Sequence, residues 1–187
     1  MPLIVKLKAT LYILLFFIAV TAQGQINYRS GDDTPASCDT PTHPDYQTLE
    51  RFYENLGGGS WTTATNWLEC DVCNWAGITC VAGRVTEISL KNNNLTGYFF
   101  FVPGELPELR KLDFSDNQLD VGFGSGNNSP VYLNYLDLSN NAISVIPGGL
   151  DGLEYLRYLD LSSNEIDIIM QDYLRDINAI QHLDLSD

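Results

Sequence analysis

The segment LRKLDFSDNQL, which runs from Leu109 to Leu119, shows a pattern from which the fold of this chain can be inferred. Apolar residues stand at its first, fourth, sixth and eleventh positions, and Asn117 stands at the ninth. Because side chains alternate between the two faces of a strand, Leu112 and Phe114 point to the same side. The segment therefore predicts a short strand with one buried face, followed by a turn that contains an asparagine.

The same pattern recurs along the second half of the chain. Units begin at Val85, Leu109, Leu133, Leu156 and Ile180, which are 23 or 24 residues apart. Their shared form, L-x-x-L-x-L-x-x-N-x-L, is that of a leucine-rich repeat. Ordering one unit costs about 1–2 kcal/mol per residue, more than its few buried leucines return, so the units must stack and share a core. We therefore expect an α/β-type repeat solenoid over 85–187, a right-handed superhelix with a parallel β-sheet on its concave face.

Each of the four full units carries its asparagine where the chain turns out of the strand. These residues are Asn93, Asn117, Asn141 and Asn164. Backbone groups at such a turn lose their partners in the sheet, and an amide offers two donors and an acceptor to replace them. We expect a structural asparagine ladder with no chemical role.

The N-terminus has the proportions of an export signal. Lys6 and Lys8 precede an apolar run from Ala9 to Ala22, which is shorter than the roughly 20 residues of a membrane-spanning helix. Small residues near Gly24 suit a signal peptidase, so we expect a signal peptide over 1–24 and a linker over 25–44. An uncleaved signal anchor is the alternative. The expectation is a secreted or cell-surface protein with no membrane insertion after cleavage.

Four cysteines, Cys38, Cys70, Cys73 and Cys80, follow this signal. An exported chain with an even number of cysteines favours disulfides, for which three pairings exist. Zinc is disfavoured because neither His43 nor His182 stands at a spacing that completes a site with three of them. A thioredoxin-like redox role is disfavoured because no βαβ pattern surrounds the motif.

The chain is strongly acidic. Its formal net charge is -14, and loss of the two signal lysines makes it -16. Nucleic acid and anionic membrane surfaces are therefore poor partners, whereas a protein or peptide with a basic surface is attracted. The alternative is an acidic surface that serves solubility alone.

Residues 45–84 have the features of a cap that covers the open end of the solenoid. Asp45 is placed to N-cap a helix whose apolar face is Leu49, Phe52, Tyr53 and Leu56, and GGG follows that helix. All three tryptophans come next, and a hairpin turn at Ala82 and Gly83 leads into the first repeat.

This cap and first repeat, LERFYENLGGGSWTTATNWLECDVCNWAGITCVAGRVTEISLKNNNLTG, resemble those of plant-type leucine-rich repeat proteins. That class includes polygalacturonase-inhibiting proteins and receptor-like kinase ectodomains, and similar caps occur in secreted bacterial and protist proteins. The resemblance covers 45–187, and WAGITC and LTG are its sharpest elements. It implies the pairs Cys38–Cys70 and Cys73–Cys80. The family's L-x-G-x-I-P signature is only partial, with YFFFVP after Gly97, which leaves a second, outer sheet without full sequence support.

Outward positions of the strands form columns that are the candidates for function. One column contains Lys111, Tyr135, Tyr158 and His182, the next contains Asp113, Asp137 and Asp160, and Arg110 and Arg157 flank the first. Paired tyrosines are typical of binding surfaces, although tyrosine also suits strands in general. The aspartates suit a basic ligand, with calcium as an alternative; we assign no metal and no cofactor.

The predicted function is an extracellular recognition module that binds a protein or peptide through its concave face. A structural or adhesive segment of a longer surface protein is the second reading, and a glycosidase is a distant third, because a regular repeat produces close aspartate pairs by itself. The chain is therefore expected not to be an enzyme. It stops at HLDLSD, before the asparagine due at position 188, so we expect either a longer gene product or pairing of the last unit with another chain.

Overall fold

The computed structural model describes residue 38 and residues 41–97, 105–120, 132–145, 150, 153–167 and 177–187. All of them belong to one compact unit, Pro35–Asp187. The predicted signal peptide lies outside the described residues, as does the YFFFVP segment after Gly97.

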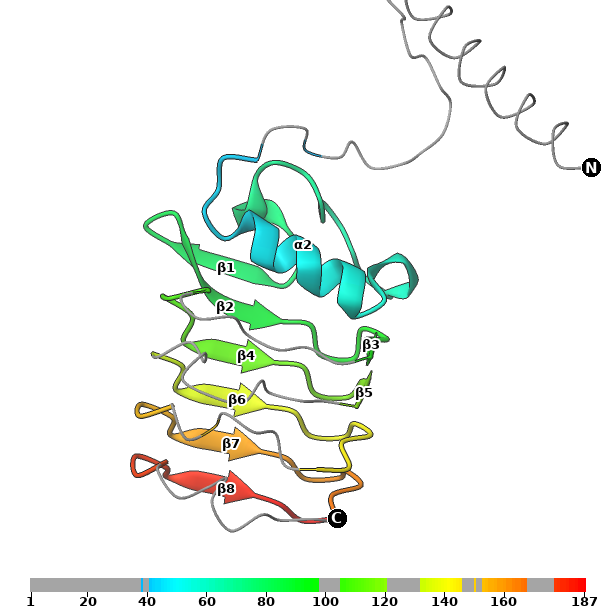
Figure 1. Cartoon of the computed structure of the whole chain (residues 1–187), viewed down its shortest axis with the longest axis vertical. Helices are drawn as coiled ribbons and strands as arrows, with labels where there is room; N and C mark the ends of the chain where they lie inside the picture. Colours follow the sequence, from blue (N-terminus) through cyan, green and yellow to red (C-terminus); the bar gives the residue numbers. More distant parts are fainter. Residues whose placement is uncertain are drawn as a thin grey trace, which may run out of the picture. The chain divides into compact units, whose positions relative to one another are not determined.

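A six-stranded sheet runs through this unit in the order β1-β2-β4-β6-β7-β8 (Figure 1). Its strands are β1 (Ile78–Val81), β2 (Arg84–Ser89), β4 (Lys111–Asp113), β6 (Tyr135–Asp137), β7 (Tyr158–Asp160) and β8 (His182–Asp184). β1 and β2 form an antiparallel hairpin that turns at Ala82 and Gly83, both with positive φ, as predicted. The later strands pair in parallel, one from each repeat. The predicted repeat solenoid is confirmed.

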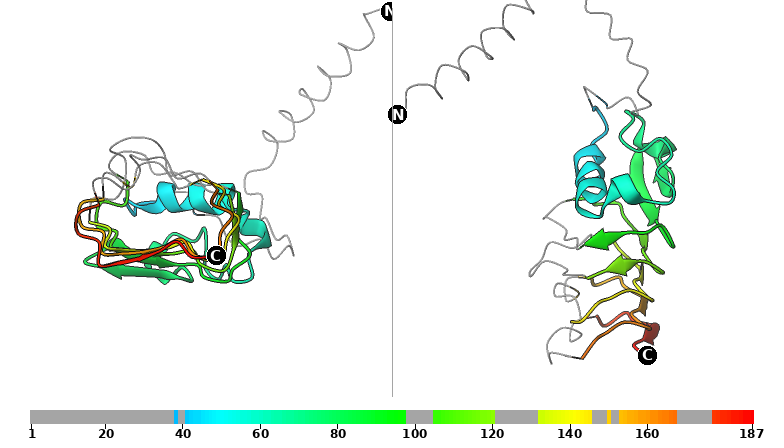
Figure 2. Two further views of the ribbon diagram at one scale, coloured as in Figure 1. Left: turned by 90° about the horizontal axis from the view of Figure 1, so that it is seen from below. Right: turned by 90° about the vertical axis from the view of Figure 1, so that its right-hand side faces the viewer.

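The register matches the repeat. Glu87, Lys111, Tyr135, Tyr158 and His182 are aligned across the sheet, as are Ser89, Asp113, Asp137, Asp160 and Asp184. Between these two columns, Ile88, Leu112, Leu136 and Leu159 point into the core and are fully buried. Leu183 of β8 holds the same position and is 44% exposed. Seen along the stack, successive strands superimpose on one side, with α2 in the opposite layer (Figure 2).

Helix α2 (Tyr46–Asn55) and the 3-10 turns η1 (Gly58–Ser60) and η2 (Val72–Asn74) build the cap. The predicted apolar face of α2 is present, since Leu49, Phe52 and Leu56 are buried. Phe52 meets Phe114 of the second repeat edge-on at 6.3 Å between centroids, which joins the cap to the repeat core. Gly57, in the left-handed region at φ 73°, follows the helix as expected.

The three tryptophans form one aromatic cluster inside the cap. Trp67 contacts Trp61 and Trp75, each at 4.7 Å between ring centroids. Each indole N–H donates to a backbone carbonyl, those of Leu56, Ala76 and Glu69. Large rings with satisfied polar atoms therefore fill the cap, which explains why all three lie in this part of the sequence.

The prediction that Asp45 caps the N-terminus of the helix is wrong. Its side chain makes no capping hydrogen bond to α2. Its carboxylate instead accepts from the Arg84 guanidinium at 2.6 and 3.1 Å and from the Val85 amide at 2.9 Å. An almost fully buried acid thus fixes the start of the helix to the start of β2, 40 residues further on.

A second, parallel sheet is present despite the partial signature. It pairs β3 (Thr96–Gly97) with β5 (Gln118–Leu119). Gly97 has φ 88°, and a Cβ there would lie 2.7 Å from the Asn55 carbonyl oxygen, so only glycine fits between α2 and this sheet. The outer sheet of the class therefore forms over the first two repeats.

Both disulfides have the pairing that the resemblance implies. Cys38 bonds to Cys70 with Cα atoms 4.9 Å apart, and Cys73 bonds to Cys80 with Cα atoms 5.5 Å apart. The CDVCNWAGITC segment is thus a stapled part of the cap. Among the described residues, no helix is long and apolar enough to cross a bilayer.

Candidate functional site

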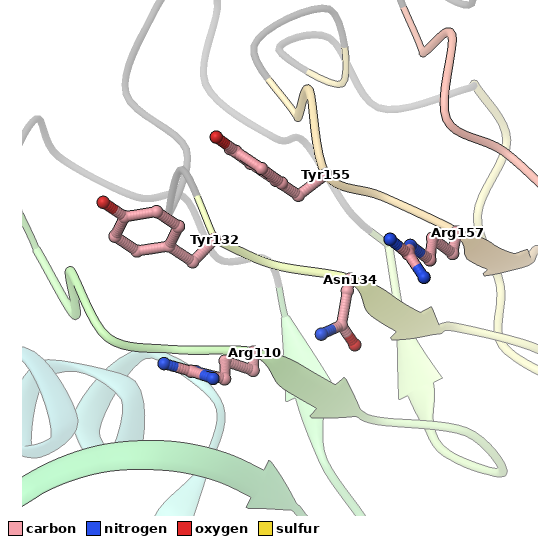
Figure 3. A pocket seen from close by; sticks show the side chains of 5 residues that line it. All are labelled: Arg110, Tyr132, Asn134, Tyr155 and Arg157. Carbon is pink, nitrogen blue, oxygen red and sulfur yellow. The ribbon is translucent and has the colours of Figure 1, made fainter.

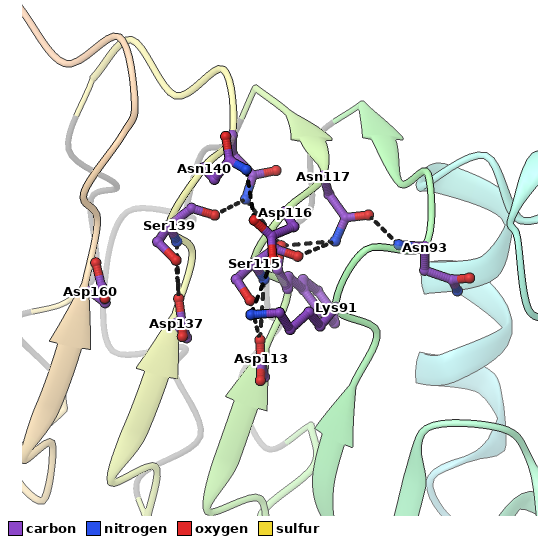
Figure 4. Close-up of polar contacts among 12 residues, drawn as sticks. Lys91, Asn93, Asp113, Ser115, Asp116, Asn117, Asp137, Ser139, Asn140 and Asp160 are labelled. Carbon is purple, nitrogen blue, oxygen red and sulfur yellow. Dashed lines mark hydrogen bonds and ion pairs between the residues drawn. The ribbon is translucent and has the colours of Figure 1, made fainter. Parts of the chain in front are cut away.

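The asparagine ladder fixes the C-terminal ends of the strands (Figure 4). The Asn117 amide nitrogen donates to the carbonyls of Leu90, Phe114 and Ser115, and its oxygen accepts from Asn93 and Leu95. Asn141 and Asn164 make equivalent bonds in the next repeats. Asn93 differs, because its side chain exchanges two hydrogen bonds with the backbone of Thr63 in the cap. The ladder thus links each strand end to the unit before it.

A strip of stacked rings crosses the outward side of the sheet, which we call the strand face. Tyr135 and Tyr158 lie 4.3 Å apart between centroids with ring planes 5° apart, and His182 stacks on Tyr158 at 4.4 Å and 7°. The Lys111 ammonium lies 4.9 Å from the Tyr135 ring centroid, within cation–π range. Adjacent strands are about 4.8 Å apart, so the sheet itself imposes this stacking.

The aspartate column beside the strip is already bonded within the chain. In Asp113, Asp137 and Asp160, Oδ1 accepts from the hydroxyl and amide of the serine two residues later. Oδ2 of Asp137 and of Asp160 also accepts from Tyr135 and Tyr158, each at 3.2 Å. Asp113 and Asp137 are only 8% exposed. The serines and tyrosine hydroxyls therefore offset the repulsion between stacked carboxylates, and few acceptor positions remain for a ligand.

These contacts explain the protonation of the tyrosines. Burial, and after it the negative charge of Asp137, raise the pKa of the Tyr135 phenol. Burial and Asp160 raise the pKa of the Tyr158 phenol in the same way. Both hydroxyls therefore stay protonated near neutral pH and act as donors that hold the rings in place.

A pocket of about 460 Å³ adjoins the strip on the N-terminal side of the strands (Figure 3). Its lining residues are Arg110, Tyr132, Asn134, Tyr155 and Arg157. Tyr132 and Tyr155 are about half exposed, and their ring centroids lie 5.6 Å apart. The flanking arginines named from the sequence thus share one pocket with a second tyrosine pair.

Tyr132, Asn134 and Tyr155 were missed by the sequence analysis. The signal was the octet YLNYLDLS at 132–139 and its near-copy YLRYLDLS at 155–162, in which the first tyrosine repeats as faithfully as the second. This tyrosine precedes the strand, so it is not among the outward strand positions that form the candidate columns.

Among the described residues, two groups of histidine, cysteine or aspartate side chains have possible metal-ligand atoms within 4.8 Å of one another. In the group of His43, Cys73 and Cys80, both sulfurs are already bonded to each other. In the group of Asp160, His182 and Asp184, the aspartates accept hydrogen bonds from Ser162 and Ser186. Hydrogen bonds from Ser186 also lower the pKa of the Asp184 carboxyl. We assign no metal to either group.

Comparison with known proteins identifies the family that shares this architecture. The fold and its ladder define a leucine-rich repeat solenoid with a disulfide-linked cap, and residues 131–187 match the family model described as leucine rich repeat. The ectodomain of the receptor kinase SOBIR1 from Arabidopsis thaliana superposes with a TM-score of 0.57 at 30% identity, over 74% of this chain and 76% of that one. The chain belongs to the leucine-rich repeat family and is similar to receptor-kinase ectodomains.

Two further relatives agree. A chain of the BIR3–SERK2 complex from Arabidopsis thaliana superposes with a TM-score of 0.56 at 25% identity, over 75% of this chain and 80% of that one. Phytosulfokine receptor 1 from Arabidopsis thaliana is 33% identical over 123 residues, which cover 63% of this chain. This chain spans only 12% of that receptor's length.

Proposed function

We propose that this chain is an extracellular or cell-surface recognition module that binds a protein or peptide partner through the strand face. The observation that carries the proposal is the ring strip of Tyr135, Tyr158 and His182, which is held rigid by stacking and by the aspartate column. Rigid aromatic area loses little entropy on binding and is enriched in interface hot spots.

Export is part of the proposal. The N-terminal signal pattern motivates it, and the two disulfides are of the kind that persists in oxidising compartments. The similarity to receptor ectodomains and to a chain of a two-protein complex supports the same function. The basic partner surface stays a prediction that rests on the formal charge of -14, since the aspartate oxygens are already bonded.

A capture experiment tests the proposal. The full chain is immobilised and exposed to extracellular material of its source organism, beside the Tyr135→Ala/Tyr158→Ala variant and the matched Tyr135→Phe/Tyr158→Phe variant. A partner retained by the wild type and the phenylalanine variant, but lost by the alanine variant, is expected. Equal capture by all three chains would contradict binding at the strip and favour the scaffold role.

A further inference from the structure

The pocket beside the strip has a local charge opposite to that of the whole chain. The sequence holds 24 acidic and 10 basic residues, yet two of its six arginines line this pocket, and none of the described residues that line it is acidic. An anionic group is thus disfavoured over most of the molecule and favoured at this place.

Both guanidinium groups are available to a ligand. Arg157 makes no side-chain hydrogen bond or ion pair within the described part of the chain. Arg110 approaches Glu108 at 3.9 Å, the outer limit of an ion pair, and both side chains are largely exposed. Such a pair contributes about 1 kcal/mol or less, so a better-placed carboxylate can displace it.

The spacing suits a single small anion. Arg110 precedes β4 and Arg157 precedes β7, two strands away, so their backbones are about 10 Å apart. Asn134 lies between them in Figure 3 and adds an amide donor. Two long side chains can converge on a group above Asn134, and the planar guanidinium fork matches a carboxylate in two parallel hydrogen bonds.

The tyrosines add a surface for the molecule that carries the anion. Tyr132 is 46% and Tyr155 is 52% exposed, and both line the pocket at the starts of the strands. Two exposed rings beside a charged pocket favour a peptide chain over an isolated small ion, because a small ion would leave both rings in water.

We infer that this pocket binds a single carboxylate of a peptide partner, with Arg110 and Arg157 as its ligands and Tyr132 and Tyr155 against the peptide chain. The inference rests on the proposed function and adds the chemistry of the partner at this position. The carboxylate belongs to an aspartate or glutamate side chain or to the C-terminus of the peptide.

Three pools of N-acetylated peptides, whose random positions exclude acidic residues, test the inference by fluorescence anisotropy with the full chain. One pool has a central glutamate and an amidated C-terminus, the second has glutamine and a free C-terminus, and the third has glutamine and an amide. At least one carboxylate pool should bind, and the pool that binds identifies the source. Arg157→Gln should weaken that binding about 10- to 100-fold, as expected for loss of a charged hydrogen-bonded pair.

Lys91→Gln is the matched control. It removes one positive charge at the other end of the strands, where Lys91 pairs with Asp116 at 3.1 Å, and should leave binding unchanged. Binding of the neutral pool as tightly as the others, equal losses in both variants, or no binding by any pool would overturn the inference. A partner that depends on Tyr135 and Tyr158 but not on Arg157 would overturn it while leaving the proposed function intact.

Discussion

Asparagine side chains of this chain differ widely in what they contribute to its stability. Asn117→Ala should lower the free energy of unfolding by about 2–4 kcal/mol, because three carbonyls and two amides lose their partner. Asn134→Ala is the control, since this exposed side chain makes no hydrogen bond within the described residues, and it should cost less than about 0.5 kcal/mol. Urea denaturation measures both, and similar losses would contradict the structural role.

The strip tyrosines give a pH signature. Their raised pKa values mean that they stabilise the fold fully below pH 10.0, the ordinary value, and that this contribution is lost as pH rises through the folded-state pKa. Phenolate absorbance should therefore show a late-titrating fraction in the wild type that shrinks in Tyr135→Phe/Tyr158→Phe. Tyr46, whose pKa burial also raises, remains as the internal reference. An unchanged late fraction would contradict this assignment.

For single residues, the sequence predicted which side chains of each strand point inward and which point outward, because side chains alternate strictly between the two faces of a strand. It did not predict the bonding of Asp45, since the partner Arg84 is 39 residues away and no local pattern encodes that contact. It also could not show that the aspartates are bonded to serines, although the D-x-S spacing was visible.

Among the elements, the junction between cap and first repeat depends on one glycine. Gly77 has φ 82°, and a Cβ there would lie 2.3 Å from the backbone oxygen of Ser89 in β2. Gly77→Ala should therefore destabilise by about 2 kcal/mol more than Gly83→Ala, which has a similar φ of 72° but nothing within 4 Å. Thermal unfolding of the two variants tests this. Equal losses of stability would show that the positive φ alone, and not the clash with Ser89, sets the cost of the substitution.

The two disulfides should also differ. Cys38–Cys70 closes a separation of 32 residues and Cys73–Cys80 one of 7. Loop-closure entropy then predicts that Cys38→Ala/Cys70→Ala lowers stability by about 1 kcal/mol more than Cys73→Ala/Cys80→Ala. Denaturant midpoints of the two variants test this, and the opposite order would show that native contacts of the short loop dominate.

The repeat strands could be predicted because their pattern is long and periodic, and the cap could be predicted because its helix, tryptophans and cysteines resemble those of a known class. The β3–β5 sheet could not, since each strand has two residues and its pairing depends on how far neighbouring units advance around the coil. The ladder residue Asn93 shows the same limit, as its partner Thr63 belongs to the cap and not to a repeat.

Over the whole molecule, the repeat turns a short pattern into two adjoining surfaces, the strand face and the pocket at the starts of the strands. The strand register aligns Tyr135 with Tyr158, and the residues just before the strands align Tyr132 with Tyr155 beside two arginines. The proposed binding function therefore depends on columns of side chains, and the leucine core and ladder serve to hold them in register.

Binding at the strand face is best tested by the dissociation constant of the captured partner for the Tyr135→Ala/Tyr158→Ala chain. Titration calorimetry against the purified partner should show binding about 100-fold weaker than wild type, since truncating each hot-spot anchor costs about 2 kcal/mol with partial overlap. Circular dichroism should show an intact fold, because these side chains point away from the leucine core. An affinity within about twofold of wild type would contradict binding at the strand face.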